Sequence, residues 1–230
     1  MVTSINTFQR NSKSVNPRAR RWVWVAVISL CVIGGVAVFG RIVLLGSPPR
    51  GGPADMVYIN ALFAKEKALT LAHVITALLF VTLVPFYFMI GLRESGSELH
   101  RRIGWAVIGV GGVLGVTALM MSIRIPISAN ASAATSLYGC FFLFSLLRAI
   151  WLLRSGDLAL HEEWMTRAIG IALGVTTTRP IMGIFFATSR LTGLGPREFF
   201  GMAFWIGFTL TYIAAEAWIR VNWNYEPATR

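Results

Sequence analysis

Six long apolar runs follow one another along the chain, separated by shorter polar segments. A helix needs about 20 apolar residues to cross the ~30 Å hydrocarbon core of a bilayer, and each run is of that order. The pattern therefore predicts an all-α fold, a polytopic transmembrane helix bundle with six spans. The runs extend over Trp22–Leu45, Lys67–Leu92, Ile103–Ile123, Ala134–Leu153, Met165–Ser189 and Phe199–Arg220.

Polar segments at the two ends and after the first run predict the domain organisation. Residues 1–21 are polar and basic, and the run after them is too long for the apolar region of a signal peptide. We expect this first helix to be retained in a six-helix transmembrane domain over 22–220, with a short tail at 221–230. Gly and Pro residues at the start of 46–66 predict that this segment is the longest loop.

Composition and charge agree with a membrane protein. The chain is 55% hydrophobic and 13% charged, with a mean hydropathy of +0.64, whereas soluble domains carry about 25% charged residues. A net charge of +11 would suggest nucleic acid for a soluble protein. Because no basic stripe with interleaved aromatics occurs, we expect no nucleic-acid partner, and the lipid bilayer is the predicted surrounding.

The distribution of Lys and Arg predicts the orientation of the bundle. Cytoplasmic loops of membrane proteins carry an excess of these residues. With the N-terminus inside, thirteen of them fall on the cytoplasmic side and seven on the outer side, while Arg179 lies within a span. We therefore predict that both termini are cytoplasmic.

Two of the predicted cytoplasmic turns are similar in sequence. Leu92-Arg93 precedes His100 and Leu153-Arg154 precedes His161 at the same spacing, so the two segments are offset by 61 residues. Spans two and three would then form one hairpin and spans four and five another, with both histidines at the same membrane face. Chance similarity in a chain rich in Leu and Arg is the alternative to this two-hairpin repeat.

Two short motifs lie at these turns, of which the second is the more specific, and two charged positions lie further along the chain. They are His-Arg-x-x-Gly at His100, Arg101 and Gly104, His-x-x-Trp-Met-x-Arg at His161, Trp164, Met165 and Arg167, Arg179 in Thr-Thr-Thr-Arg, and Glu216 in Ala-Glu-Ala-Trp. Over about residues 70 to 220 the chain resembles a large bacterial family catalogued as predicted membrane proteins with a domain of unknown function. The resemblance implies a helical membrane fold and brings no established activity. We expect a multi-pass protein of the inner (plasma) membrane.

The three histidines are candidates for cofactor chemistry, because neutral imidazole binds haem iron, copper or zinc. His100 and His161 stand at the two similar turns, and His73 lies about 9 Å inside the second span by the helical rise. Haem b or a metal ion is the cofactor that they would hold. A cap or interface role is the alternative for each, and no carboxylate-and-His spacing of the zinc type occurs on one helix.

Arg167 and Glu216 are predicted to pair. They lie about 3 Å and 6 Å from the inner ends of the fifth and sixth spans, so they are level. A carboxylate inside a membrane is costly unless it is paired. Arg220, one helical turn from Glu216, is the alternative partner. The pair would act as a structural clamp or as part of a proton relay.

His73, Arg124 and Arg179 form a third group, in the predicted outer half. A guanidinium near mid-membrane costs about 2.5–3.5 kcal/mol on an insertion scale. Helix carbonyls near Pro180, the hydroxyls of Thr176 to Thr178, water or an anion could offset that cost. If the three side chains share a pocket, it would take an anionic or carbonyl-bearing ligand, such as a quinone, a lipid headgroup or haem propionates.

These groups favour a histidine-dependent redox or cofactor-binding membrane protein, with haem, a metal ion or a quinone as the ligand. The candidate cofactor-binding residues are His73, His100, His161, Arg124, Arg167, Arg179 and Glu216. A small-molecule or proton transporter is one alternative. A non-catalytic assembly or accessory subunit, in a homo-oligomer or a membrane complex, is another. The sequence contains no Ser-His-Asp grouping, P-loop or dinucleotide-binding turn, so we expect no catalytic domain of the soluble type.

Overall fold

The computed structural model describes residues 17–47, 51–93 and 98–222, and these ranges form seven α-helices. Six of the helices are long and apolar enough to cross a membrane, which confirms the predicted helical membrane fold with six spans. The remaining helix, α2, has 12 residues and is too short to cross. The helices are α1 (Pro17–Gly46), α2 (Ala54–Lys65), α3 (Lys67–Arg93), α4 (Glu98–Arg124), α5 (Ala129–Arg154), α6 (Leu158–Thr192) and α7 (Pro196–Asn222).

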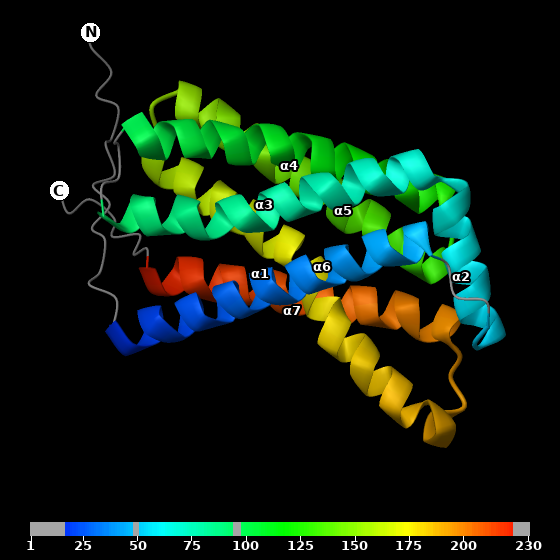
Figure 1. The fold of residues 1–230 in the computed structure, drawn as a ribbon. Helices are drawn as coiled ribbons and strands as arrows, with labels where there is room; N and C mark the ends of the chain where they lie inside the picture. The colour runs from blue at the N-terminus through cyan, green and yellow to red at the C-terminus, as the bar shows by residue number, and fades with distance from the viewer. Residues whose placement is uncertain (1–16, 48–50, 94–97, 223–230) are drawn as a thin grey trace, which may run out of the picture.

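Helix α2 corrects the prediction of a loop over 46–66. Asp55 lies in its first turn and Lys65 in its last, the arrangement that the helix dipole favours. The helix lies across one end of the bundle, and α3 begins directly after Glu66 (Figure 1). Ile59 of α2 is fully buried in a hydrophobic cluster with residues of α6 and α7. Packing therefore stabilises this helix, since a helix of its length is marginal alone.

Helix α6 begins earlier than its apolar run predicts. The expected start was near Met165, whereas the helix starts at Leu158. The Asp157 side chain accepts a hydrogen bond from the Leu160 backbone N–H at 3.0 Å and caps the helix. The polar motif around His161 therefore forms the first turns of α6, because a cap and tertiary contacts extend a helix beyond its apolar residues.

The predicted tails lie largely outside the described residues. Helix α1 begins at Pro17, so the last residues of the basic segment 1–21 are helical. Helix α7 ends at Asn222, at the start of the predicted tail 221–230. The remaining parts of both tails, 1–16 and 223–230, are not described.

Helix α6 occupies a central position and contacts α1, α5 and α7. Its first half is packed into the main hydrophobic cluster, where Met165 and Ile169 are buried. Pro180 lies inside the helix, and the segment after it diverges from the other helices (Figure 1). Proline removes a backbone hydrogen bond and kinks a helix. The divergent segment ends at Gly193, whose φ of 70° caps the helix in the left-handed region.

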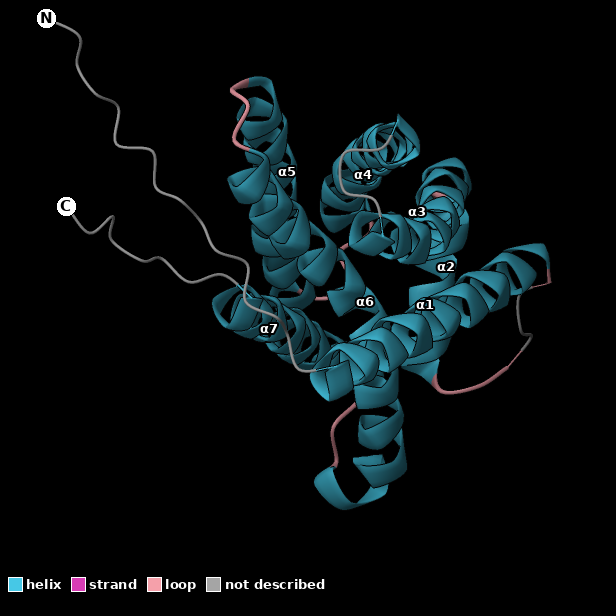
Figure 2. Ribbon diagram, turned by 90° about the vertical axis from the view of Figure 1, so that its left-hand side faces the viewer, coloured by secondary structure: helices cyan, strands magenta, loops and turns pink. Residues whose placement is uncertain are grey.

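Large apolar side chains cover the outside of the bundle. Val36 and Phe39 of α1 are 69% and 70% exposed, and Ile123 and Leu147 on α4 and α5 are similarly exposed. Figure 2 shows α1 at the edge of the bundle. Such a surface is rare in soluble monomers and is the surface that contacts lipid in a membrane. The structure therefore describes a multi-pass membrane protein in contact with a lipid bilayer.

The start of α1, the end of α7 and the starts of α4 and α6 lie at one end of the bundle (Figure 1). The cytoplasmic location of that end is a prediction from the basic residues. The two-hairpin repeat is a prediction from the similarity of the two turns. We expect a reporter fused after Gly156 to be cytoplasmic and one fused after Gly195 to be outside. Reporter activity in the two fusions measures this, and the same location for both would contradict the predicted orientation.

Candidate functional site

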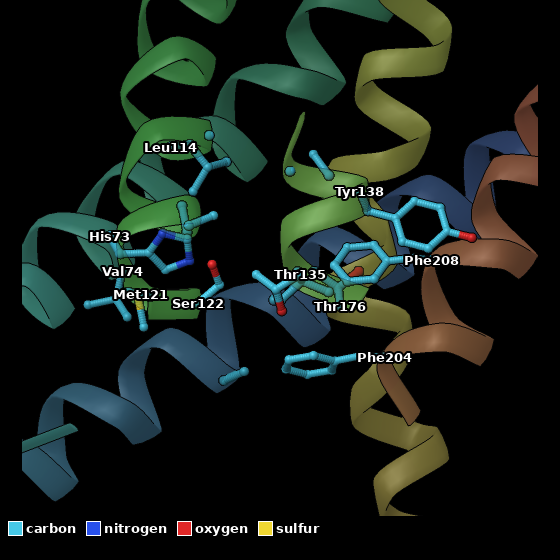
Figure 3. Close-up of a pocket in the computed structure, with 18 of the residues that line it drawn as sticks. His73, Val74, Leu114, Met121, Ser122, Thr135, Tyr138, Thr176, Phe204 and Phe208 are labelled. Carbon is cyan, nitrogen blue, oxygen red and sulfur yellow. The ribbon is translucent and has the colours of Figure 1, made fainter. Parts of the chain in front are cut away.

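A cavity of about 190 Å³ lies in the half of the bundle nearest α2, and residues from all seven helices line it. Its wall is mainly apolar. Figure 3 shows Phe204 and Phe208 on one side of the space and His73 on the other. The charged side chains of the lining are Arg41 and Arg179, and no Asp or Glu is found among the described lining residues. The cavity is thus an apolar chamber with a positive charge.

His73 points from α3 into this space, toward Ser122 (Figure 3). Its Nδ1 lies 3.0 Å from the Thr117 hydroxyl oxygen. That hydroxyl donates its single hydrogen to a carbonyl of its own helix, Val113 at 2.8 Å or Leu114 at 3.0 Å. With the hydroxyl hydrogen on its own helix, the Thr117 oxygen accepts the hydrogen bond and His73 donates it from Nδ1. When the ring is neutral, Nε2 then keeps a free lone pair, which can accept a hydrogen bond or bind a metal.

Arg179 lines the cavity with one nitrogen of its guanidinium unpaired among the described residues. Its Nε is buried and has no hydrogen-bond partner among the described residues. The hydroxyls of the preceding segment, Thr176–Thr178, were candidates to offset its charge. They donate to carbonyls of their own helix, at 2.7, 3.2 and 2.7 Å, and no hydrogen bond joins them to Arg179 in the described part of the chain. Donors of the guanidinium therefore remain available in the cavity.

Arg41 of α1 is a second guanidinium of the cavity that the sequence did not single out. Its Nη1 donates to the Asn60 side-chain oxygen at 2.9 Å, and its Cζ lies 4.0 Å from the centre of the Phe63 ring. Arg41 and Arg179 are near enough to interact electrostatically. The signal in the sequence was a charge inside the first apolar run, and this arginine is one of the seven basic residues counted on the outer side.

Arg124 does not belong to this group, contrary to the expectation that it shares a pocket with His73 and Arg179. It is exposed at the end of α4 and does not line the cavity. Arg124 is the last residue of α4, as the sequence predicted for the third span. The direction of its side chain around the helix axis differs from the expectation, because packing sets that direction.

His100 and His161 lie at the opposite end of the bundle, in the first turns of α4 and α6. His161 is 7% exposed, and its Nδ1 lies 2.9 Å from the Ala149 carbonyl oxygen. A carbonyl can only accept, so Nδ1 donates and Nε2 keeps its lone pair. The His100 ring stacks on Tyr87 with the ring centres 4.9 Å apart. The two histidines are near enough to interact electrostatically, in agreement with their predicted location at one face.

Arg167 and Glu216 form the predicted ion pair between α6 and α7. Nε and Nη2 of Arg167 donate to the two Glu216 carboxylate oxygens at 2.6 and 3.2 Å. Arg167 also lies 3.6 Å from Glu163, a carboxylate that the sequence did not single out and that is 1% exposed. Its spacing of four residues from Arg167 was the available signal.

The candidate residues therefore form two separate groups. Arg167 and Arg179 are on the same helix, and the helical rise separates them by about 18 Å. Within the described part of the chain, no group of three or more His, Cys, Asp or Glu side chains could hold a metal ion. The group at the starts of α4 and α6 contains two histidines and the Arg167–Glu216 ion pair, whereas the group nearer α2 lines a cavity.

Comparison with known proteins gives one match. The family model described as "Predicted membrane protein (DUF2306)" matches residues 70–219, which is more than half of the chain. This segment contains every residue of the two groups except Arg41. No curated protein and no solved structure matches the chain.

Proposed function

From the premise that the chain belongs to the predicted membrane protein (DUF2306) family, we propose that it binds a membrane-dissolved ligand with an oxygen-bearing head, of which a quinone is the reference case. The ligand lies in the cavity, with its head between His73 and Arg179. The observation that carries the proposal is the buried Arg179 Nε, for which the described residues provide no hydrogen-bond partner. A guanidinium in a membrane span costs about 2.5–3.5 kcal/mol, and a ligand oxygen would offset part of that cost.

The two polar side chains have complementary roles toward such a head. Arg179 can only donate hydrogen bonds, so it suits a carbonyl or an anionic oxygen. His73 offers the Nε2 lone pair and suits a hydroxyl. A quinone presents carbonyl oxygens and its reduced form presents hydroxyls, so both forms find a partner. His73 would thus take part in the redox chemistry of a bound quinone by accepting a hydrogen bond from the hydroxyl of the reduced form.

The size of the cavity supports a ring or a short chain as the ligand. An engineered protein cavity of about 150 Å³ is large enough for benzene, and this cavity has about 190 Å³. Pockets for drug-sized ligands measure about 300–1,000 Å³. The volume therefore favours a quinone head over a porphyrin. The apolar lining supplies the contacts that a ring requires.

We expect Arg179→Gln and His73→Phe each to weaken binding of decylubiquinone by at least about tenfold. Each variant removes one hydrogen-bonding group from the cavity. Titration of the purified full-length protein in lipid nanodiscs, followed by its intrinsic tryptophan fluorescence, measures the affinity. Arg124→Gln is the matched control, because this arginine is exposed and outside the cavity, and its affinity should equal that of the unaltered protein.

Thermal unfolding separates a binding defect from a folding defect. Arg179→Gln removes an unpaired charge, so its midpoint should not fall. Ala118→Phe places a ring in the cavity that Ala118 lines and should prevent binding while the protein stays folded. Binding of the quinone that is unaffected by all three cavity variants would show that the cavity is not its site, and absence of binding would refute the proposal for quinones.

A further inference from the structure

We propose that the natural ligand is an anionic amphiphile, a carboxylate or phosphate monoester on one apolar chain or ring, and that Arg41 is the second residue that binds its head. This inference rests on the proposed function of the same cavity and specifies the class of ligand. The reason is the balance of charge: two guanidinium groups line the cavity, and no carboxylate is among its described lining residues.

The two arginines line the same cavity and make its wall positive. Like charges repel more strongly in a protein interior than in water. His73 adds no negative charge to the cavity, since its Nδ1 contact with Thr117 is compatible with a neutral or a protonated ring. A neutral quinone head would leave this repulsion in place. An anionic head removes it and accepts hydrogen bonds from both guanidinium groups.

Arg41 is held in position to bind a head group. Its Nη1 is bonded to Asn60 and its plane lies over Phe63, which leaves most of its five N–H donors for a ligand. Helix α1 is itself fixed against α6, because a Cβ at Gly34 would lie 2.7 Å from the Thr176 Cγ2 atom. Arg41 is two helical turns beyond this contact, about 10 Å nearer to α2.

The lining changes from polar to apolar along the cavity, as an amphiphile requires. Arg41 and Phe63 lie at the end that α2 covers, whereas Phe80 and Phe142 line the deeper part and contact each other edge to face. The head would lie toward α2 and the chain toward the bundle core. A volume of about 190 Å³ accommodates one short chain and not the two acyl chains of a phospholipid.

Arg41 lies outside the segment that the family model matches, whereas His73 and Arg179 lie inside it. The matched segment therefore supplies one guanidinium and one imidazole. The second charge comes from α1, which covers the cavity from the edge of the bundle. Arg41 is thus the residue through which this chain would select an anionic ligand over a neutral one.

The test compares ligands that differ only in the charge of the head. Octanoate, octyl phosphate and octanol are titrated, with decylubiquinone, into the full-length protein in phosphatidylcholine nanodiscs. We expect the tighter of the two anions to bind at least about tenfold more tightly than octanol. The order of octanoate and octyl phosphate identifies which anionic head the site prefers.

Arg41→Gln should reduce this preference for the anion to less than about threefold while octanol binding stays the same. Arg190→Gln, which alters an exposed arginine outside the cavity, should keep the full preference. Equal binding of anions and octanol, or a preference that survives Arg41→Gln, would overturn the inference. If decylubiquinone binding then still depends on Arg179, the proposed function stands, whereas failure of all four probes refutes both.

Discussion

Replacement of Glu216 by leucine should lower the free energy of unfolding by about 3 kcal/mol, at the lower end of the range for breaking a buried ion pair. The change leaves Arg167 without the carboxylate that binds two of its nitrogens. Its other carboxylate contact, Glu163, is longer, at 3.6 Å. The Arg167 and Glu216 side chains are 16% and 22% exposed, so solvent or lipid headgroups moderate the loss.

A double-mutant cycle separates the pair from the loss of side-chain contacts. The variant with both Arg167→Met and Glu216→Leu carries no unpaired charge and should recover most of the lost stability. Equilibrium unfolding of the detergent-solubilised protein measures all four forms. If Glu216→Leu is as stable as the unaltered protein, the pair is not a clamp between α6 and α7, and a role for Glu216 in proton transfer becomes the better explanation of its position.

Gly207→Ala should destabilise the bundle by about 1–3 kcal/mol, the usual cost of overpacking. A Cβ at this position would lie 2.7 Å from the Thr178 Cγ2 atom and 2.9 Å from the Gly174 carbonyl oxygen. The carbonyl is backbone and cannot move alone, so α6 and α7 must separate. Close helix approach at small residues is a main source of packing energy in membranes.

The same substitution at Gly183 is the matched control. Gly183 is on α6, whereas Gly207 is on α7, and a Cβ at Gly183 would meet no atom within 4 Å. Gly183→Ala should therefore leave stability unchanged or raise it by up to about 1 kcal/mol, since alanine favours a helix. Thermal unfolding in the same detergent compares the two variants, and equal midpoints would contradict the close contact at Gly207.

The Gly207 variant also has an expected effect on the cavity. Thr178, which the added Cβ would displace, directly precedes Arg179 in the chain. A shift of α6 at this point would move the guanidinium relative to His73. We therefore expect Gly207→Ala to weaken binding of any ligand that requires both groups, although Gly207 does not line the cavity.

The sequence alone was sufficient for the six spans and for the pairing of Arg167 with Glu216. Both follow from one-dimensional properties. A span needs enough consecutive apolar residues to match the bilayer, and the pair follows from opposite charges at equal depth in a medium where an unpaired acid is costly. Neither inference needs the arrangement of the helices around one another.

Only the tertiary structure decided which arginines share the cavity with His73. Arg124 and Arg41 were both assigned to the outer side, yet Arg41 lines the cavity and Arg124 is exposed. Each residue turns a helix by about 100°, so depth does not determine which neighbour a side chain faces. The rotation of α1 and α4 is set by packing, including the close contact at Gly34. Helix α2 was not predicted, for a related reason. The hydrophobic cluster that stabilises it consists otherwise of residues far along the chain, so the sequence of α2 alone does not indicate it.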